Sequence, residues 1–148
     1  MIWKPHVTVA AVIERDGQFL LLEEHTSQGV RFNQPAGHLE AHESLFDAVV
    51  RETLEESAYH FAPKNLTGIY RWHAKAANRT YLRFAFTGEL TDFEPNRALD
   101  TGIIRALWLS PEEIRATQSR HRSPLVLRCI EDYLAGHRYP LELITHYE

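Results

Sequence analysis

The order of hydrophobic and polar positions predicts a strand hairpin at the beginning of the chain. Residues 6–13 (HVTVAAVI) are mostly apolar and β-branched, which is typical of a buried strand. Asp16 and Gly17 give a tight-turn signal, and residues 18–24 (QFLLLEE) then predict the returning strand. Residues 25–31 are polar and contain a glycine, so we expect them to form a loop.

A short extended segment and then a helix are expected next. Residues 32–35 predict a short or edge strand, because Pro35 lacks the N–H group that a central strand would need. The helix is expected to begin near Ser44, since Asp47 stands three residues later as in a weak capping box. Its apolar residues recur at helical spacing, which predicts that one face packs against a sheet.

Two strand-like runs, residues 66–74 and 80–90, predict a second hairpin with its turn near residues 76–78. Residues 92–102 are polar and contain a proline, so we expect a loop. Residues 103–109 (IIRALWL) then predict another strand.

The last part of the chain predicts two helices. Ser110 and Pro111 provide a cap and a first-turn proline, and Ser123 and Pro124 repeat this arrangement. Gly136 is the expected end of the last helix. The order of elements predicts an α+β or α/β sandwich in which helices flank a mixed sheet.

Length and composition indicate one globular domain, residues 1–148. The chain has 16 Lys and Arg against 20 Asp and Glu, which argues against the basic surface of nucleic-acid-binding proteins. It has one cysteine, so no intrachain disulfide can form, and no apolar run approaches the ~20 residues of a bilayer span. With no recognisable signal peptide, the cytoplasm is the expected compartment.

Three carboxylates at helical spacing give the strongest chemical signal. Glu52, Glu55 and Glu56 fall within roughly 100° of arc on the expected helix. Carboxylates gathered on a partly buried face are costly unless a positive charge lies among them. Oxygen ligands suit a hard cation, so the expected cofactor is Mg2+, with Mn2+ as a substitute. The nine histidines show no paired ligand spacing, so we expect no zinc site.

These carboxylates belong to a longer pattern. The spacing G-x5-E-x7-R-E-U-x-E-E-x-G-U resembles the Nudix box, the signature of hydrolases that act on nucleoside diphosphates linked to another group. The matching positions are Gly37, Glu43, Arg51, Glu52, Glu55 and Glu56. The segments WKPHVTVAAVI, FNQPAGHLE, LRFAF, RSPLV and GHRYPLEL resemble the NudJ-type bacterial phosphatases of this family, so the resemblance spans nearly the whole chain.

The resemblance implies a Nudix-type α/β/α sandwich with a mixed sheet and a catalytic loop and helix. It also implies an enzyme acting on phosphoanhydride bonds, a Mg2+-dependent phosphohydrolase. Its substrates would be nucleoside di- and triphosphates, with hydroxymethylpyrimidine diphosphate or thiamine diphosphate. Two alternatives stay open: a pyrophosphohydrolase of the ADP-ribose or dinucleotide type, and a non-catalytic nucleotide-sensing module. We expect a small-molecule substrate, no nucleic acid or membrane partner, and a monomer or homodimer.

The resemblance also implies roles by position in the box. Glu52 and Glu56 should be the principal metal ligands, and the backbone carbonyl of Gly37 a further one. Glu55 would be another ligand or the base that takes a proton from the attacking water, so all three glutamates are catalytic candidates. Arg51 and Glu43 are expected to form an ion pair that holds the loop onto the helix, which is a structural role.

Other residues are candidates for contact with the substrate. Arg71 and Arg83 lie on strands expected to border the cleft, where either guanidinium could bind phosphate. His38 and Glu40 lie in the loop of the box, and Asp100 is an alternative base supplied by a later loop. The aromatic candidates for stacking on a base are Phe32, Trp72 and Tyr81, although aromatic residues in strands are more often part of the core. Cys129 is expected to be a packed core residue.

Three positions depart from the family pattern. Thr53 and Tyr59 stand where aliphatic residues are usual, and Ala58 replaces a glycine. Alanine adopts the positive φ of such a glycine only at a cost of about 1 kcal/mol, so we expect the helix to run slightly longer or to end differently. None of the three changes removes a ligand, and we expect activity to persist.

Overall fold

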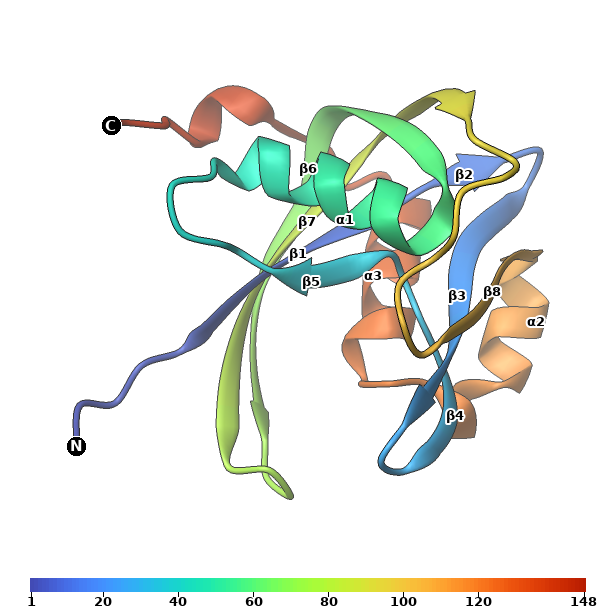
Figure 1. Ribbon diagram of the computed structural model, residues 1–148, viewed down its shortest axis with the longest axis horizontal. Helices are drawn as coiled ribbons and strands as arrows, with labels where there is room; N and C mark the ends of the chain where they lie inside the picture. Colours follow the sequence, from blue (N-terminus) through green and yellow to red (C-terminus); the bar gives the residue numbers. More distant parts are fainter.

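The computed structural model describes residues 1–148 as alternating strands and helices (Figure 1). The strands are β1 (His6–Val12), β2 (Glu14–Arg15), β3 (Gln18–Thr26), β4 (Gly29–Asn33), β5 (Ala36–His38), β6 (Tyr59–Ala74), β7 (Arg79–Phe93), β8 (Ile103–Leu109) and β9 (Tyr139–Pro140). The helices are α1 (Leu45–Ser57), α2 (Pro111–Ala116) and α3 (Leu125–Leu134), with the short 3-10 helices η1 (Gln118–Arg120) and η2 (Leu141–Leu143). None of these helices is long and apolar enough to cross a membrane.

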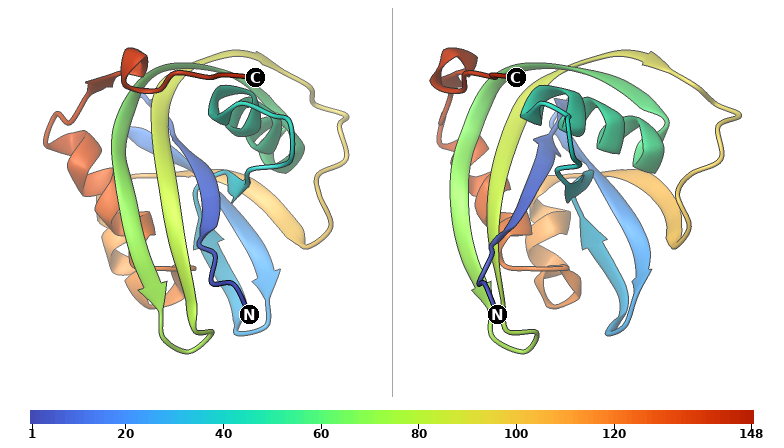
Figure 2. Two further views of the ribbon diagram at one scale, coloured as in Figure 1. Left: turned by 90° about the vertical axis from the view of Figure 1, so that its left-hand side faces the viewer. Right: turned by 60° about the vertical axis from the view of Figure 1, so that its left-hand side comes forward.

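The strands form two sheets. The mixed sheet has the order β5-β1-β7-β6-β9, with β1 and β7 parallel and the other pairs antiparallel. In the second sheet β3 pairs with β2, β4 and β8, always antiparallel. Helix α1 lies against one face of the mixed sheet and α3 against the other (Figure 2).

Two buried apolar clusters occupy the two faces of the mixed sheet. One cluster joins Val9 of β1, Val49 of α1 and Phe86 of β7. The other joins Val12 of β1 with Ile130 of α3. Residues of β1 alternate between the clusters because successive side chains of a strand point to opposite faces. The expected α+β sandwich with a mixed sheet and flanking helices is therefore confirmed.

The expected loop at residues 25–31 is wrong, because β3 continues to Thr26 and β4 begins at Gly29. The Thr26 hydroxyl closes the turn: it accepts a hydrogen bond from the N–H of Gln28 at 3.1 Å and donates to the carbonyl of Gly29 at 2.6 Å. The φ of Gly29 is +100°, which glycine adopts without steric cost. The tip of this hairpin is largely exposed, and its polar residues therefore look like a loop in the sequence.

The second hairpin is longer than the sequence indicated. Strand β6 already begins at Tyr59, and β7 runs to Phe93, where a loop was expected. Pro63 does not end β6, because it stands at one of three register shifts between β6 and β7, where the ladder is interrupted. The shifts accompany a strong bend of the long hairpin, which curves over α1 (Figure 2).

Candidate active site

The beginning of α1 fixes where its carboxylates lie. The Ser44 hydroxyl accepts a hydrogen bond from the N–H of Asp47 at 3.0 Å and so caps the helix. Two turns later Glu52 lies directly against β5: a Cβ atom on Gly37 would come within 2.2 Å of the Glu52 carboxyl carbon. Only glycine permits this approach between strand and helix.

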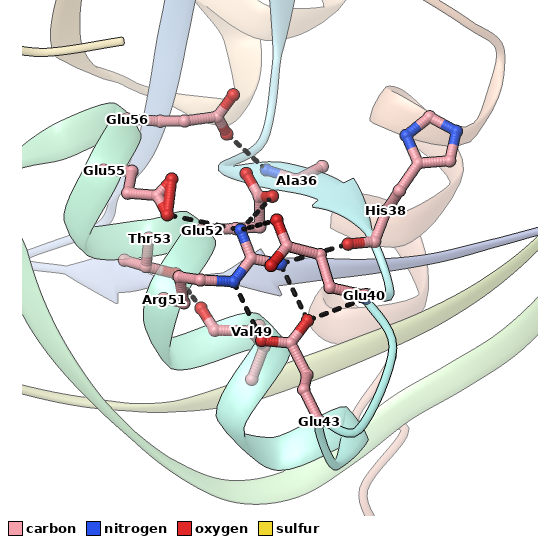
Figure 3. Close-up of polar contacts among 10 residues, drawn as sticks. All are labelled: Ala36, His38, Glu40, Glu43, Val49, Arg51, Glu52, Thr53, Glu55 and Glu56. Carbon is pink, nitrogen blue, oxygen red and sulfur yellow. Dashed lines mark hydrogen bonds and ion pairs between the residues drawn. The ribbon is translucent and has the colours of Figure 1, made fainter.

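Arg51 connects the loop of the box with the carboxylates (Figure 3). Its guanidinium donates to both carboxylate oxygens of Glu43, each at 2.8 Å, and to the carbonyl of His38 at 3.1 Å. It also pairs with Glu52 at 2.7 Å and with Glu55 at 3.3 Å. The contacts with Glu43 and His38 tie the loop to the helix, while the remaining donors orient two carboxylates.

Glu52, Glu55 and Asp100 present carboxylate oxygens that lie within 4.8 Å of one another. Asp100 belongs to the loop before β8, and its backbone N–H donates to the carbonyl of Glu55 at 3.0 Å. That bond holds the loop beside the end of α1. Converging carboxylate oxygens suit a hard divalent cation, so Mg2+ and Mn2+ both fit this donor set.

Glu56 lies apart from these three converging carboxylates. One of its oxygens accepts a hydrogen bond from the N–H of Ala36 in β5 at 2.8 Å (Figure 3). Burial raises the pKa of Glu56 to about 9, and the charges of Glu52 and other nearby acids act in the same direction. Without a cation, Glu56 therefore stays protonated at neutral pH.

Two other acids of the site, Glu52 and Asp100, also have shifted pKa values. Burial raises the pKa of Glu52, although Arg51 opposes the shift. Burial and the charge of Glu55 raise the pKa of Asp100. One arginine does not compensate this concentration of negative charge, so a divalent cation would relieve the repulsion and could recruit an anionic substrate.

Comparison with known proteins assigns the family. A model of the NUDIX domain matches residues 4–129. This chain belongs to the NUDIX family. Phosphatase NudJ of Escherichia coli (strain K12) is 43% identical over 143 residues, which cover 97% of this chain and 92% of that protein. The expected family and the resemblance to NudJ-type phosphatases are confirmed.

Solved structures agree with this assignment to the NUDIX family. A NUDIX hydrolase from Nitrosomonas europaea is 55% identical, with a TM-score of 0.95 and coverage of 97% of this chain and 98% of that chain. A MutT NUDIX hydrolase from Burkholderia pseudomallei shares the fold at 17% identity, with a TM-score of 0.75 and coverage of 88% and 98%. The expected enzyme class, a hydrolase of phosphoanhydride bonds, agrees with these relatives.

The NUDIX domain places the two candidate phosphate-binding arginines differently. Arg83 is only 6% exposed, and its guanidinium donates to the side-chain oxygens of Gln34 at 3.0 Å and Asn33 at 3.2 Å. Its contacts join β7 to the end of β4. Arg71 is exposed on β6. The structure therefore gives Arg83 internal partners and leaves Arg71 on the surface.

The candidates His38 and Glu40 lie at the end of β5 and in the loop that follows it. His38 directly follows Gly37 and has an exposed side chain. The Glu40 side chain is 64% exposed and lies 3.4 Å from the Arg51 guanidinium, at the rim of the network. Glu40 is therefore accessible to a ligand at the carboxylates, whereas the His38 ring points away from them and only its carbonyl faces Arg51 (Figure 3).

The three aromatic candidates differ in how far their rings are buried. Phe32 is 4% exposed, and the Arg120 guanidinium lies 4.5 Å from its ring centre, so its ring is a packing element. Trp72 and Tyr81 stack on each other with ring centres 5.7 Å apart and remain half-exposed. Cys129 is fully buried, as expected of a core residue.

The three departures from the NUDIX pattern have local explanations. Thr53 is fully buried, and its hydroxyl donates to a backbone carbonyl one turn earlier at 2.7 Å. The expectation that the helix would run longer or end differently is wrong: Ala58 adopts a φ of +66°, and its N–H donates to the carbonyl of Leu54 at 2.9 Å. The Tyr59 ring packs on Phe93 with ring centres 4.5 Å apart, so a partly exposed aromatic pair takes the place of an aliphatic side chain.

Proposed function

We propose that this chain is a Mg2+-dependent phosphohydrolase, with Mn2+ as a substitute, that removes phosphate from nucleoside di- and triphosphates in the cytoplasm. Hydroxymethylpyrimidine diphosphate and thiamine diphosphate are further substrates within the same proposal. The observation that carries it is the convergence of Glu52, Glu55 and Asp100 oxygens within 4.8 Å. The 43% identity to Phosphatase NudJ supports a phosphatase over other activities of the family.

The carboxylates of α1 would hold the metal. Glu52, Glu55 and Glu56 are the ligands in this proposal, together with the carbonyl of Gly37. The positions in the box indicate Glu52 and Glu56 as the principal pair, and the convergence of Glu52 with Glu55 supports Glu55 as a further ligand. A bound divalent cation neutralises phosphate oxygens and the charge that develops in the transition state. Arg51 keeps Glu52 and Glu55 oriented through its bonds of 2.7 and 3.3 Å, so their oxygens are positioned before the substrate arrives.

The attacking water needs a proton acceptor. The oxygen of the water forms a bond to phosphorus, and the bridging P–O bond breaks. The released phosphate then separates from the rest of the substrate. Glu55 and Asp100 are the candidate bases, because they are more exposed than Glu52 and Glu56. Partial desolvation and the charge of Glu55 raise the pKa of Asp100, a direction that favours proton uptake by that carboxylate.

A colorimetric phosphate-release assay with nucleoside di- and triphosphates tests the proposal. Glu52→Gln and Glu56→Gln should each lower turnover by roughly 100-fold, because both remove a carboxylate from the proposed metal site. Glu112→Gln is the matched control, since Glu112 is an exposed acid in the first turn of α2. Unchanged turnover in both site variants would contradict the metal assignment.

The products distinguish this function from its alternatives. Inorganic phosphate should appear together with a nucleotide that has lost one phosphate group. Preferential cleavage of ADP-ribose into AMP and ribose 5-phosphate, or of a dinucleotide into two nucleotides, without release of inorganic phosphate, would favour the pyrophosphohydrolase alternative. Nucleotide binding without turnover at every Mg2+ and Mn2+ concentration would favour a sensing module.

A further inference from the structure

Strand β6 has an outer edge that is only partly paired. It lies between β7 and β9 in the mixed sheet, and β9 pairs with it only at Asn65 and Leu66. Residues 68–74 of β6 pair with β7 on the inner side and with no strand on the outer side. No other part of the chain supplies a backbone partner for them. A row of backbone N–H and C=O groups therefore faces away from the sheet, in the projecting end of the β6–β7 hairpin (Figure 1).

This free edge is regular, as an added strand requires. The register shifts between β6 and β7 end at Gly68, and the pairs from there to Ala74 follow without interruption. The segment contains no proline, and neither a bulge nor another element covers its outer side, although edge strands are commonly protected in these ways. The short antiparallel β9 already uses the same edge next to Gly68, so an extended segment can continue its line along β6.

The space beside the beginning of the free edge is open. A hollow of about 410 Å³ lies between residues 66–70 of β6, helix α3, Tyr139 of β9 and Leu143 of η2. These elements meet at the outer side of β6 (Figure 2). Ile69 and Leu143 are 52% and 63% exposed, so the walls of the hollow include uncovered apolar side chains. An added strand therefore has room for its backbone and can place an apolar side chain against these walls.

The charges along the free edge favour an acidic occupant. Arg71 and His73 are exposed and belong to the same face of β6, because they are two positions apart, and the exposed Lys75 directly follows the strand. The whole chain has a net charge of −4, so this positive charge is local. Two copies paired through this edge would bring their basic side chains together, and like charges directly opposite each other destabilise a sheet. Acidic side chains at the same positions would be attracted.

The acid nearest to this edge is compensated within the chain. Asp132 of α3 lines the hollow and accepts hydrogen bonds from the Tyr70 hydroxyl at 2.8 Å and from the Arg128 guanidinium at 3.1 Å. Its charge is therefore not free to repel an acidic segment that pairs with β6.

We propose that residues 68–74 of β6 bind an extended acidic segment of a partner protein, which adds to the mixed sheet antiparallel to β6 and in line with β9. Main-chain hydrogen bonds supply affinity in this mode of binding, and alternate side chains supply specificity. The edge is opposite to β5, which carries Gly37 beside the carboxylates. The partner and the substrate therefore occupy separate places, and this inference does not depend on the proposed function.

Calorimetry with a synthetic peptide of the sequence Val-Glu-Val-Glu-Val-Ile tests the charge preference. In antiparallel pairing with β6 its glutamates lie opposite His73 and Arg71. The peptide Val-Lys-Val-Lys-Val-Ile should bind at least about tenfold more weakly. Arg71→Glu should weaken the acidic peptide about fivefold and strengthen the basic one. Lys64→Glu is the matched control, because Lys64 is exposed on β6 outside the free edge, and it should change neither affinity.

Backbone methylation of the acidic peptide tests the strand addition. One form carries N-methyl groups on its first, third and fifth residues, and the other on its second, fourth and sixth. Only one of these sets of N–H groups faces β6 in an antiparallel pair, so one form should lose binding and the other should keep it. Loss in both forms, or in neither, would overturn the inference.

Three further outcomes would also overturn the inference. The first is the absence of binding of the acidic peptide at about 1 mM, and the second is equal binding of the acidic and basic peptides. The third is a dimer of the protein in sedimentation experiments that the acidic peptide dissociates, because the edge would then belong to a second copy of the chain.

Discussion

The carboxylate of Glu56 accepts a hydrogen bond from the backbone N–H of Ala36 at 2.8 Å, in surroundings that raise its pKa to about 9. The fold therefore buries an acid that holds its proton at neutral pH when no cation is present. A cation that uses this carboxylate must displace that proton. Metal binding, pH and folding stability are consequently coupled at Glu56.

In the metal-free protein, we expect the Glu56 contribution to stability to fall as pH rises from 5 to 9. The folded pKa of about 9 exceeds the ordinary value of 4.5, so folding favours the protonated form. The stability is fully present below the unfolded pKa and is lost as pH rises toward the folded one. Glu56→Gln should remove this slope and increase the free energy of unfolding at pH 8 by on the order of 5 kcal/mol. Urea denaturation in EDTA at several pH values measures the slope and the free energy of unfolding. An unchanged slope in the variant would contradict the raised pKa of Glu56.

Mg2+ should stabilise the wild-type protein, and more strongly at pH 8.5 than at pH 6.5, because fewer protons then compete for the carboxylates. A Mg2+ concentration of 100 times Kd should add about 2.7 kcal/mol to the free energy of unfolding. Thermal denaturation with and without MgCl2 measures the effect. Glu52→Gln should abolish it, and Glu112→Gln should preserve it. Full stabilisation of the Glu52 variant would show that Mg2+ binds elsewhere.

Gly37→Ala should weaken Mg2+ binding at least about tenfold, because the new Cβ would lie 2.2 Å from the Glu52 carboxyl carbon and force the strand or the carboxylate to move. Mg2+ titration by calorimetry measures the loss. Gly17→Ala is the control for backbone strain: its φ is +79°, and no heavy atom lies within 4 Å of the added Cβ. That variant should lose about 1 kcal/mol of stability and keep its metal affinity. Equal affinities in wild type and Gly37→Ala would argue against the close approach.

Arg51→Lys should lower both stability and turnover. An ammonium group cannot reproduce the two 2.8 Å bonds to Glu43 together with the bonds to Glu52 and the His38 carbonyl. We expect a loss of about 2 kcal/mol in the free energy of unfolding, because buried acceptors lose their donors. We also expect roughly tenfold lower kcat, because Glu52 loses its orientation. Arg128→Lys, at an exposed pair with Asp132, should change neither quantity appreciably.

The carboxylates of α1 could be predicted from the sequence because helical spacing alone brings them to one face. The sequence predicts Asp100 only as an alternative base, because no local pattern in residues 92–102 indicates that its side chain lies at the site. A backbone hydrogen bond from its N–H to the carbonyl of Glu55 brings it to the site, and that contact exists only in the folded chain. The participation of a distant loop is therefore a tertiary property.

Ala58 illustrates how tertiary packing overrides a local preference. Its propensity argued against a left-handed helix end, yet the residue has a φ of +66° and is only 4% exposed. Burial of Ala58 and packing of the following Tyr59 ring on Phe93 offset the local cost of about 1 kcal/mol. The loop expected at residues 25–31 is wrong for a related reason. The paired ends of β3 and β4 leave most of their side chains in water, so the sequence shows no alternation of apolar and polar residues there.

The parallel pairing of β1 with β7 also determines when the protein can fold during its synthesis. Strand β1 is complete at Val12, but its parallel partner begins only at Arg79. The whole carboxylate helix therefore leaves the ribosome before the centre of the mixed sheet exists. Contacts between distant parts of a chain form slowly and leave apolar surface exposed in the meantime. The carboxylate site should consequently form late, after β7 has inserted between β1 and β6.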